Sequence, residues 1–354
     1  MSSTRPLAER ATAPGRRGWR LLQLGLSPCI FSFVCAAPWL AVEVAPASRA
    51  SHSRLPAVAA WARSAPTSLP PRRRPPPIAP LIRPALRGEG VWRATGPAVL
   101  GGPPVLVTTF RPAPVSPAIV AYLAWIDRTR TQLAFYPGLS SLFLGPPVAP
   151  SEVPPGQRWR LLATFNGGFK AASGAGGFAI NGHTYVSLRR GFGTVVGYRN
   201  GLVDIGSWQG GPAAAPQIAF ARQNLPLIVD HSRPNPNLSN GPQWGATLHG
   251  ATHVWRTGMG IDEHGNLIYA AADQQTVATL AAILIHAGAV RAIELDINPE
   301  WATFITYRHA GGLQASKLVS NSQQPATRYL FTDNRDFFAV YRRVPGRPLD
   351  VPFS

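Results

Sequence analysis

The stretch TVATLAAILIHAGAVRAIELDINPEW, residues 276–301, predicts a helix that leads directly into a buried strand. Thr276 is a suitable N-cap, and the apolar residues of 277–287 recur at helical spacing. Gly288 can end the helix because glycine adopts the left-handed conformation at little cost. The residues that follow change to the alternation of a strand, so this stretch contains one helix and one strand of a single fold.

Two carboxylates stand on one face of the strand predicted over residues 290–297. Because side chains alternate between the faces of a strand, Glu294 and Asp296 project to the same side. Charge at the end of a buried strand is costly unless it is paired or used. With Asn298 and Glu300, these residues offer oxygens for general acid and base chemistry or for a hard cation, Ca²⁺ or Mg²⁺. Alternatively, these carboxylates have a structural role and only accept hydrogen bonds from backbone amides or an arginine.

Outward from this stretch, short apolar runs are separated by tight-turn dipeptides. The dipeptides are Asn181-Gly182, Asn200-Gly201 and Gly265-Asn266. Each favours a hairpin because asparagine and glycine tolerate a positive φ. The 37 prolines, the 34 glycines and a charged fraction of only 14% exclude a coiled coil or a helical bundle. We therefore expect an α+β fold with a mixed, largely antiparallel sheet core and few helices.

Three other segments carry candidate binding residues. A predicted strand over 161–165 runs into Asn166, Gly167 and Gly168, where backbone amides could approach a ligand, or which could form a turn without further role. Lys170 follows this turn. A second segment holds Arg256 and Thr257 among glycines, where a fixed guanidinium could bind a phosphate with two hydrogen bonds or could lie at the surface beside a turn. The third is a loop rich in asparagine and proline that contains Asp230.

The N-terminal residues 1–45 have the pattern of an export signal or a membrane anchor. Five arginines precede the segment 21–42, which is apolar and contains no charged residue. Its 22 residues are enough to span a bilayer, and Pro28 and Pro38 favour a cleavable signal instead. We therefore expect an exported protein that is anchored in a membrane or released into the cell envelope.

The chain divides further by composition. Residues 46–104 are rich in proline, alanine and arginine, which predicts a disordered, semi-rigid linker. A domain is expected over 105–345 and a short tail over 346–354. The only cysteines, Cys29 and Cys35, precede that domain, so it can contain neither a disulfide nor a thiolate metal site.

The net charge of +18 does not indicate a nucleic-acid-binding protein. Residues 1–93 contain 14 arginines and 3 glutamates, which gives +11, and residues 94–354 contain 20 basic and 13 acidic residues, which gives +7. The expected domain is therefore only mildly basic. The densest basic stretch, residues 72–74, lies among prolines and not among the aromatic residues that nucleic-acid binding would favour. We expect no nucleic-acid partner.

The order of these segments resembles the phosphodiester glycosidase domain family over about residues 105–342. The resemblance rests on Phe165-Asn166-Gly167-Gly168-Phe169, Ile180-Asn181-Gly182, Arg256-Thr257-Gly258-Met259-Gly260, the helical segment 276–288 and Leu295-Asp296. The family includes an enzyme that removes N-acetylglucosamine from a phosphodiester. In its usual motif Gly-Gly-Gly-Ser follows the aspartate, whereas this chain has Ile297-Asn298-Pro299-Glu300 and resembles a bacterial branch that lacks the glycines.

The resemblance implies an exported hydrolase that acts on a glycosyl phosphodiester or a related envelope glycan. It implies that Arg256, alone or with Lys170, holds the phosphate and that Asp296 acts as acid, base or electrostatic stabiliser. Glu300 or Glu294 would be the second carboxylate, and Asn166, Gly167, Gly168, Thr257, Asn298 and Asp230 complete the candidate binding set. The alternative is a non-catalytic module that binds envelope glycans or phosphodiester polymers. A membrane would be a further partner if the N-terminal segment is retained.

Overall fold

A computed structural model describes residues 74–139, 150–170, 173–245 and 247–345. Every described residue belongs to one compact unit. The predicted export segment 1–45, residues 46–73 of the predicted linker and the tail 346–354 lie outside the described residues. Across the ranges that are described, no helix has both the length and the apolar character needed to cross a membrane.

The largest sheet contains the predicted helix-to-strand stretch and has eight strands in the order β1-β2-β3-β14-β13-β15-β11-β12. Neighbouring strands in this sheet are antiparallel. The strands are β1 (Arg93–Ala94), β2 (Val105–Phe110), β3 (Ala121–Ile126), β11 (Val229–Asp230), β12 (Arg233–Pro234), β13 (Val254–Ile261), β14 (Leu267–Gln275) and β15 (Arg291–Glu294). We call it the eight-stranded sheet.

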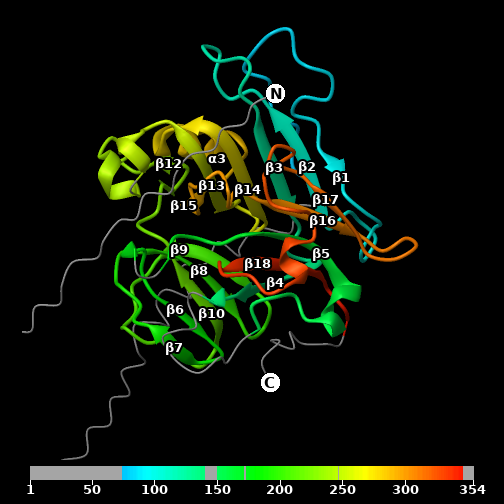
Figure 1. Cartoon of the computed structure of the whole chain (residues 1–354), viewed down its shortest axis with the longest axis vertical. Coiled ribbons are helices and arrows are strands. Elements are labelled where there is room, and N and C mark those ends of the chain that lie inside the picture. Colours follow the sequence, from blue (N-terminus) through cyan, green and yellow to red (C-terminus); the bar gives the residue numbers. More distant parts are fainter. Residues whose placement is uncertain (1–73, 140–149, 171–172, 246, 346–354) are drawn as a thin grey trace, which may run out of the picture. The chain divides into compact units, whose positions relative to one another are not determined.

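Two five-stranded sheets complete the β structure of the described residues (Figure 1). The first, in the order β7-β6-β10-β8-β9, contains β6 (Phe178–Ile180), β7 (His183–Val186), β8 (Gly193–Tyr198), β9 (Val203–Ser207) and β10 (Ile218–Gln223). The second, in the order β17-β16-β5-β18-β4, contains β4 (Thr131–Tyr136), β5 (Leu161–Asn166), β16 (Phe304–Arg308), β17 (Gln314–Lys317) and β18 (Phe337–Arg342). All of their pairings are antiparallel as well, which confirms the predicted fold class.

The local elements follow the predicted turn and cap chemistry. Helix α3 (Val277–His286) begins at Thr276, whose side chain accepts a hydrogen bond from the amide of Thr279, and Gly288 adopts a φ of +97° after it. Four 3-10 turns also lie among the described residues, namely η1 (Pro155–Arg160), η3 (Gly241–Trp244), η4 (Leu248–Gly250) and η5 (Arg328–Leu330). The predicted turn dipeptides Asn181-Gly182, Asn200-Gly201 and Gly265-Asn266 each lie between two strands that are hydrogen-bonded to each other, as expected.

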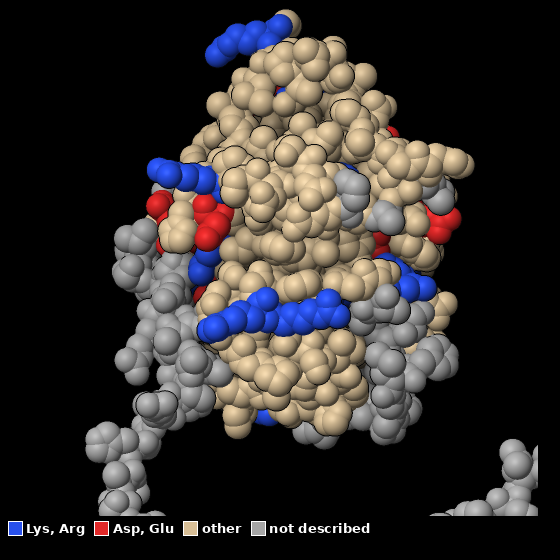
Figure 2. Space-filling model, turned by 90° about the vertical axis from the view of Figure 1, so that its left-hand side faces the viewer, with Lys and Arg blue, Asp and Glu red and all other residues tan. Residues whose placement is uncertain are grey.

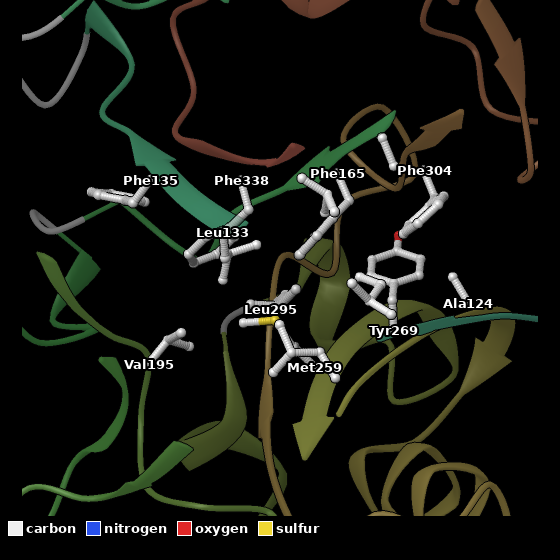
Figure 3. Close-up of a cluster of buried hydrophobic side chains, with 14 of the residues drawn as sticks. Ala124, Leu133, Phe135, Phe165, Val195, Met259, Tyr269, Leu295, Phe304 and Phe338 are labelled. Atoms are coloured by element: carbon white, nitrogen blue, oxygen red, sulfur yellow. The ribbon is translucent and has the colours of Figure 1, made fainter. Parts of the chain in front are cut away.

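Side chains from all three sheets share one hydrophobic core. In Figure 3, Phe135, Phe165 and Phe338 lie opposite Met259 and Leu295 of the eight-stranded sheet, and each of these residues is buried. The phenyl rings of Phe165 and Phe338 are 5.3 Å apart between centroids. This packing fixes the end of β5 beside the end of β15, which is where the candidate residues lie.

The domain boundary predicted at residue 105 differs from the structure, because residues 74–104 are packed onto the eight-stranded sheet. Ile78 and Trp92 are 4% and 2% exposed, and they belong to the core between that sheet and α3. The indole nitrogen of Trp92 also donates to the carbonyl of Pro76 at 2.8 Å. Composition alone predicted a linker because the few apolar residues in this stretch are separated by prolines, which hides the residues that anchor it.

Candidate functional site

The structure brings together the three segments that the sequence singles out. Backbone and hydroxyl groups of Thr257 donate to the carbonyl of Asp296 at 3.2 and 2.7 Å. The amide of Asp296 donates to the carbonyl of Gly167 at 3.1 Å. Asp296 therefore connects β13 to the turn after β5 through its main chain, and the carboxylates of 294 and 296 lie where three sheets meet.

Asn166 holds these segments in register. Its amide nitrogen donates to the hydroxyl of Thr257 at 2.9 Å and to the carbonyl of Gly167 at 3.0 Å. Its oxygen accepts from the hydroxyl of Tyr269 at 3.0 Å and from the amide of Thr303 at 3.2 Å. Because these bonds use the capacity of a buried side-chain amide, we infer that Asn166 positions the site and does not bind a ligand directly.

The two glycines after Asn166 are required by packing. A Cβ atom on Gly167 would lie 2.6 Å from Cγ of Asp336, and one on Gly168 would lie 2.7 Å from Cγ of Asn224. Asn224 in turn accepts from the amide of Phe169 and donates to the carbonyl of Glu294 at 2.6 Å. The glycines thus allow the turn to approach side chains of neighbouring elements, which the sequence could not identify.

Glu294 accepts a buried hydrogen bond from Arg256. Glu294 is fully buried and Arg256 is 3% exposed, and a guanidinium Nη1 donates to Oε1 of the carboxylate. Burial raises the pKa of Glu294 to about 8, although Arg256 acts in the opposite direction, and the nearby Asp296 raises it further. Its other oxygen, Oε2, is buried without a hydrogen-bond partner among the described residues. Glu294 therefore holds its proton at neutral pH.

Arg256 also borders a cavity of about 440 Å³. The wall includes Thr276, Val277 and Ala278 at the N-terminus of α3, together with residues of η3 and the loop after it. The guanidinium is held by the carbonyls of Gln275 and Trp244 through Nε and Nη1, while Nη2 has no hydrogen-bond partner in the described part of the chain. The positive end of a helix and a free guanidinium nitrogen together favour an anion in this cavity.

Asp296 forms an ion pair with Arg335. Asp296 is 4% exposed, and its Oδ2 accepts from Nη2 of Arg335, which precedes β18. Its Oδ1 accepts from the amide of Asn298 at 3.1 Å. Burial raises the pKa of Asp296 above its ordinary value, and the charge of Arg335 opposes this effect. Glu294 and Asp296 therefore each accept a hydrogen bond from a different arginine. This arrangement agrees with the alternative that these carboxylates only accept hydrogen bonds within the protein.

Further charged residues surround Asp296 that the sequence analysis did not select. Arg222 of β10 forms a buried ion pair with Asp336, at 2.6 Å between Nε and Oδ2. Arg328 pairs with Asp333 and lies over the ring of Trp301, with 4.7 Å from its guanidinium carbon to the ring centroid. The segment 333–336 has a run of charges directly before an apolar strand. That is the same signal that identified residues 294–300.

Four predicted site residues lie away from this cluster or at the surface. Asp230 is exposed on β11, whose register places it beyond Val229 at the opposite end of the strand pair from Asp296. Lys170, Asn298 and Glu300 are also exposed. The side-chain oxygen of Asn298 accepts from the amide of Glu300 at 2.9 Å.

The described residues do not contain a group of three or more His, Cys, Asp or Glu placed to hold a metal ion. The oxygens considered for Ca²⁺ or Mg²⁺ have other partners here. Asp296 binds Arg335 and the amide of Asn298, and the oxygen of Asn298 receives the amide of Glu300. The turn after Asp296 is thus held by its own hydrogen bonds.

Comparison with known proteins gives a distant likeness of fold. No family model matches the chain, and no curated protein is similar to it in sequence. The catalytic domain of zebrafish N-acetylglucosamine-1-phosphodiester alpha-N-acetylglucosaminidase, auto-inhibited by its pro-peptide, matches with a TM-score of 0.45 and 15% identity, over 71% of this chain and 88% of that one. A hypothetical protein from Synechocystis matches with a TM-score of 0.36 and 13% identity, over 64% of this chain and 59% of that one.

Proposed function

We propose that this protein is an exported hydrolase that releases a sugar from a glycosyl phosphodiester or a related envelope glycan. The observation that carries the proposal is the position of Arg256 between a protonated Glu294 and the cavity at the N-terminus of α3. A phosphodiester is a small anion attached to groups that need space, and this cavity offers both a positive potential and room.

The state of Glu294 controls how much positive charge Arg256 presents to the cavity. Below about pH 8 Glu294 is neutral, so the guanidinium charge is available to an anion. Above that pH the carboxylate is ionised and neutralises it. Anion affinity is therefore expected to fall as the pH rises through 8, and a bound anion would in turn strengthen the hold of Glu294 on its proton.

Asp296 is the proposed acid, base or electrostatic stabiliser. It adjoins the cavity through Ile297, which packs with Phe169 against the cavity residue Gly245; a Cβ there would lie 2.9 Å from Cδ1 of Ile297. Movement of the Arg335 side chain would free one carboxylate oxygen for a leaving group or a water molecule. Glu294, and not the exposed Glu300, is the proposed second carboxylate because it shares the buried network.

Export is part of the proposal and is supported by the N-terminal sequence. The uncharged segment 21–42 follows five arginines, which is the pattern of a signal or an anchor. An exported location would bring the protein into contact with envelope polymers that contain glycosyl phosphodiesters.

The alternative function is a module that binds such a phosphodiester without cleaving it. One observation favours it, namely that both oxygens of Asp296 already accept hydrogen bonds from within the protein. In this case Arg256 and the N-terminus of α3 would still bind the phosphate. Asp296 would only hold Arg335 and the turn at residue 298.

The test is sugar release by the purified full-length chain in detergent from nucleotide-sugars and glycosyl-1-phosphodiesters. Asp296→Asn should abolish release, and Arg256→Met should weaken binding of substrate and of inorganic phosphate in calorimetry. Asp230→Asn is the matched control, since it removes an exposed carboxylate at the other end of the strand pair. Circular dichroism establishes that each variant is folded.

The outcomes separate the two functions. Release that depends on Asp296 supports the hydrolase, while phosphate binding that depends on Arg256 without any release supports the binding module. A folded protein that neither releases sugar nor binds phosphate would overturn both.

A further inference from the structure

Exposed aliphatic side chains gather on two loops at one end of the eight-stranded sheet. Leu81, Leu86 and Val91 are 44%, 55% and 49% exposed, and Val115 in the loop between β2 and β3 is 93% exposed. Figure 1 shows the two loops, residues 79–91 and 111–120, beside each other at the ends of β2 and β3. We call these four residues the aliphatic patch. Isolated exposed aliphatics are ordinary, but four on adjoining loops suggest a contact surface.

A buried ion pair fixes the two loops to each other. The guanidinium of Arg111 binds the carboxylate of Glu89, with 2.9 Å between Nη2 and Oε2, and also donates to the carbonyls of Ile82 and Pro84. Hydrogen bonds from Arg111 lower the pKa of Glu89 to about 2, so the pair stays charged over the whole physiological range. The ion pair between Arg111 and Glu89 therefore holds the two loops of the patch in a fixed position relative to each other.

The charges around the patch have one sign. Arg83 and Arg87 are exposed among the aliphatic residues. From residue 74 to residue 126 the only acidic residue is Glu89, and it is buried against Arg111. On the face shown in Figure 2, by comparison, charged side chains are sparse and include both signs. Loops with protruding aliphatics, two exposed arginines and no exposed carboxylate of their own match the interface of an anionic lipid bilayer.

We propose that the aliphatic patch, with Arg83 and Arg87, docks onto an anionic membrane surface. The position of the patch in the chain supports a lipid occupant over a protein one. Residues 43–73 separate the uncharged segment 21–42 from residue 74 and can span up to about 110 Å, so a chain anchored there would keep the patch within reach of the bilayer. Leucine and valine would enter the headgroup region while the arginines meet lipid phosphates.

Docking in this way would orient the candidate site. Phe110, Ala121, Ala272 and Arg256 lie in one continuous row of paired residues across β2, β3, β14 and β13. The patch and the cavity beside Arg256 are therefore at the same end of the sheet. Phe110, which directly precedes the loop 111–120, is about 14 Å from Arg256 at three strand spacings. The site would then meet its substrate close to the membrane, and this consequence rests on the proposed function. The docking itself does not rest on it.

The test uses the full-length chain with Cys29 and Cys35 replaced by serine and an environment-sensitive probe on a single new cysteine. Val115→Cys places the probe in the patch, and Phe331→Cys is the matched control because Phe331 is 65% exposed and follows η5. In vesicles that contain phosphatidylglycerol, only the probe at 115 should shift to the blue and be quenched by brominated lipid. Arg83→Gln with Arg87→Gln should weaken this docking roughly 30-fold.

A second measurement needs no substitution. Trypsin cleavage of the wild-type chain after Arg87 should slow when anionic vesicles are present and should not slow with phosphatidylcholine alone. Equal probe signals at 115 and 331, or no signal at 115 with unchanged cleavage, would overturn the proposal. A blue shift at 115 that depends on protein concentration in the absence of lipid would also overturn it, since the occupant would then be a second copy of the chain.

Discussion

At the level of single residues, Glu294 is the group whose ionisation links the candidate site to the stability of the fold. Its pKa is about 8 in the folded state, against an ordinary value of 4.5, because burial disfavours the charged form. Between these two pH values the folded state keeps a proton that the unfolded state releases. The free energy of unfolding therefore falls as the pH rises from 4.5 to 8, by up to about 1.4 kcal/mol per pH unit from this group.

Glu294→Gln should remove this dependence because the amide cannot ionise. Between pH 5 and pH 8, we expect the free energy of unfolding to fall less for the variant than for the wild-type chain. The stability of the variant relative to the wild type should therefore increase as the pH rises. Urea denaturation at four or five pH values measures this. Parallel stability curves for the two proteins would show that Glu294 ionises normally in the folded state.

Gly168 is a position where packing leaves no room for a side chain. A Cβ there would contact Asn224, which holds both Phe169 and Glu294, so Gly168→Ala should destabilise the protein by about 1–3 kcal/mol. Gly211→Ala is the matched control, because a Cβ at Gly211 meets nothing within 4 Å. Urea midpoints of the two variants make the comparison, and an equal effect would contradict the packing role.

At the level of elements, the sequence predicts best what is encoded locally. The capping box at Thr276 and the dipeptides Asn181-Gly182 and Asn200-Gly201 specify their helix and hairpins through neighbouring residues alone. The alternation around Glu294 and Asp296 likewise predicted a buried strand end. These signals are physical, since each turn requires a backbone conformation that few residues adopt.

The rest of the site could not be predicted because it depends on pairs that are distant in the sequence. Arg335 is 39 residues from Asp296, and Arg222 is 114 residues from Asp336. No local pattern indicates which of many arginines will meet which carboxylate. Lys170, Asn298 and Glu300 fit the same residue types and spacing as the buried candidates, but they are exposed.

Helix α3 should depend on its N-cap. Thr276 and Thr279 form reciprocal side-chain to backbone hydrogen bonds, at 3.1 and 2.9 Å. Thr276→Ala should therefore lower the free energy of unfolding by about 1 kcal/mol, while Thr276→Ser keeps the hydroxyl and should stay close to the wild type. Chemical denaturation measures both. If alanine and serine were equivalent, the cap would not contribute to the stability of α3.

At the level of the whole described unit, buried charge is balanced by pairing. Arg222, Arg328 and Arg335 each face their own carboxylate around the junction of the three sheets. Removing one partner would leave an uncompensated buried charge, which is far more costly than losing an exposed ion pair.

The same unit includes residues 74–104, and this can be tested through Trp92. Its side chain is 2% exposed in the core beneath α3, so Trp92→Ala should lower the free energy of unfolding by about 3–5 kcal/mol. Val91→Ala changes a neighbour that is 49% exposed and should shift stability by less than about 0.5 kcal/mol. Denaturation followed by both tryptophan fluorescence and far-ultraviolet circular dichroism should show one cooperative transition. A separate early transition for this segment, with little effect of Trp92→Ala on the main one, would mean that it folds independently of the sheets.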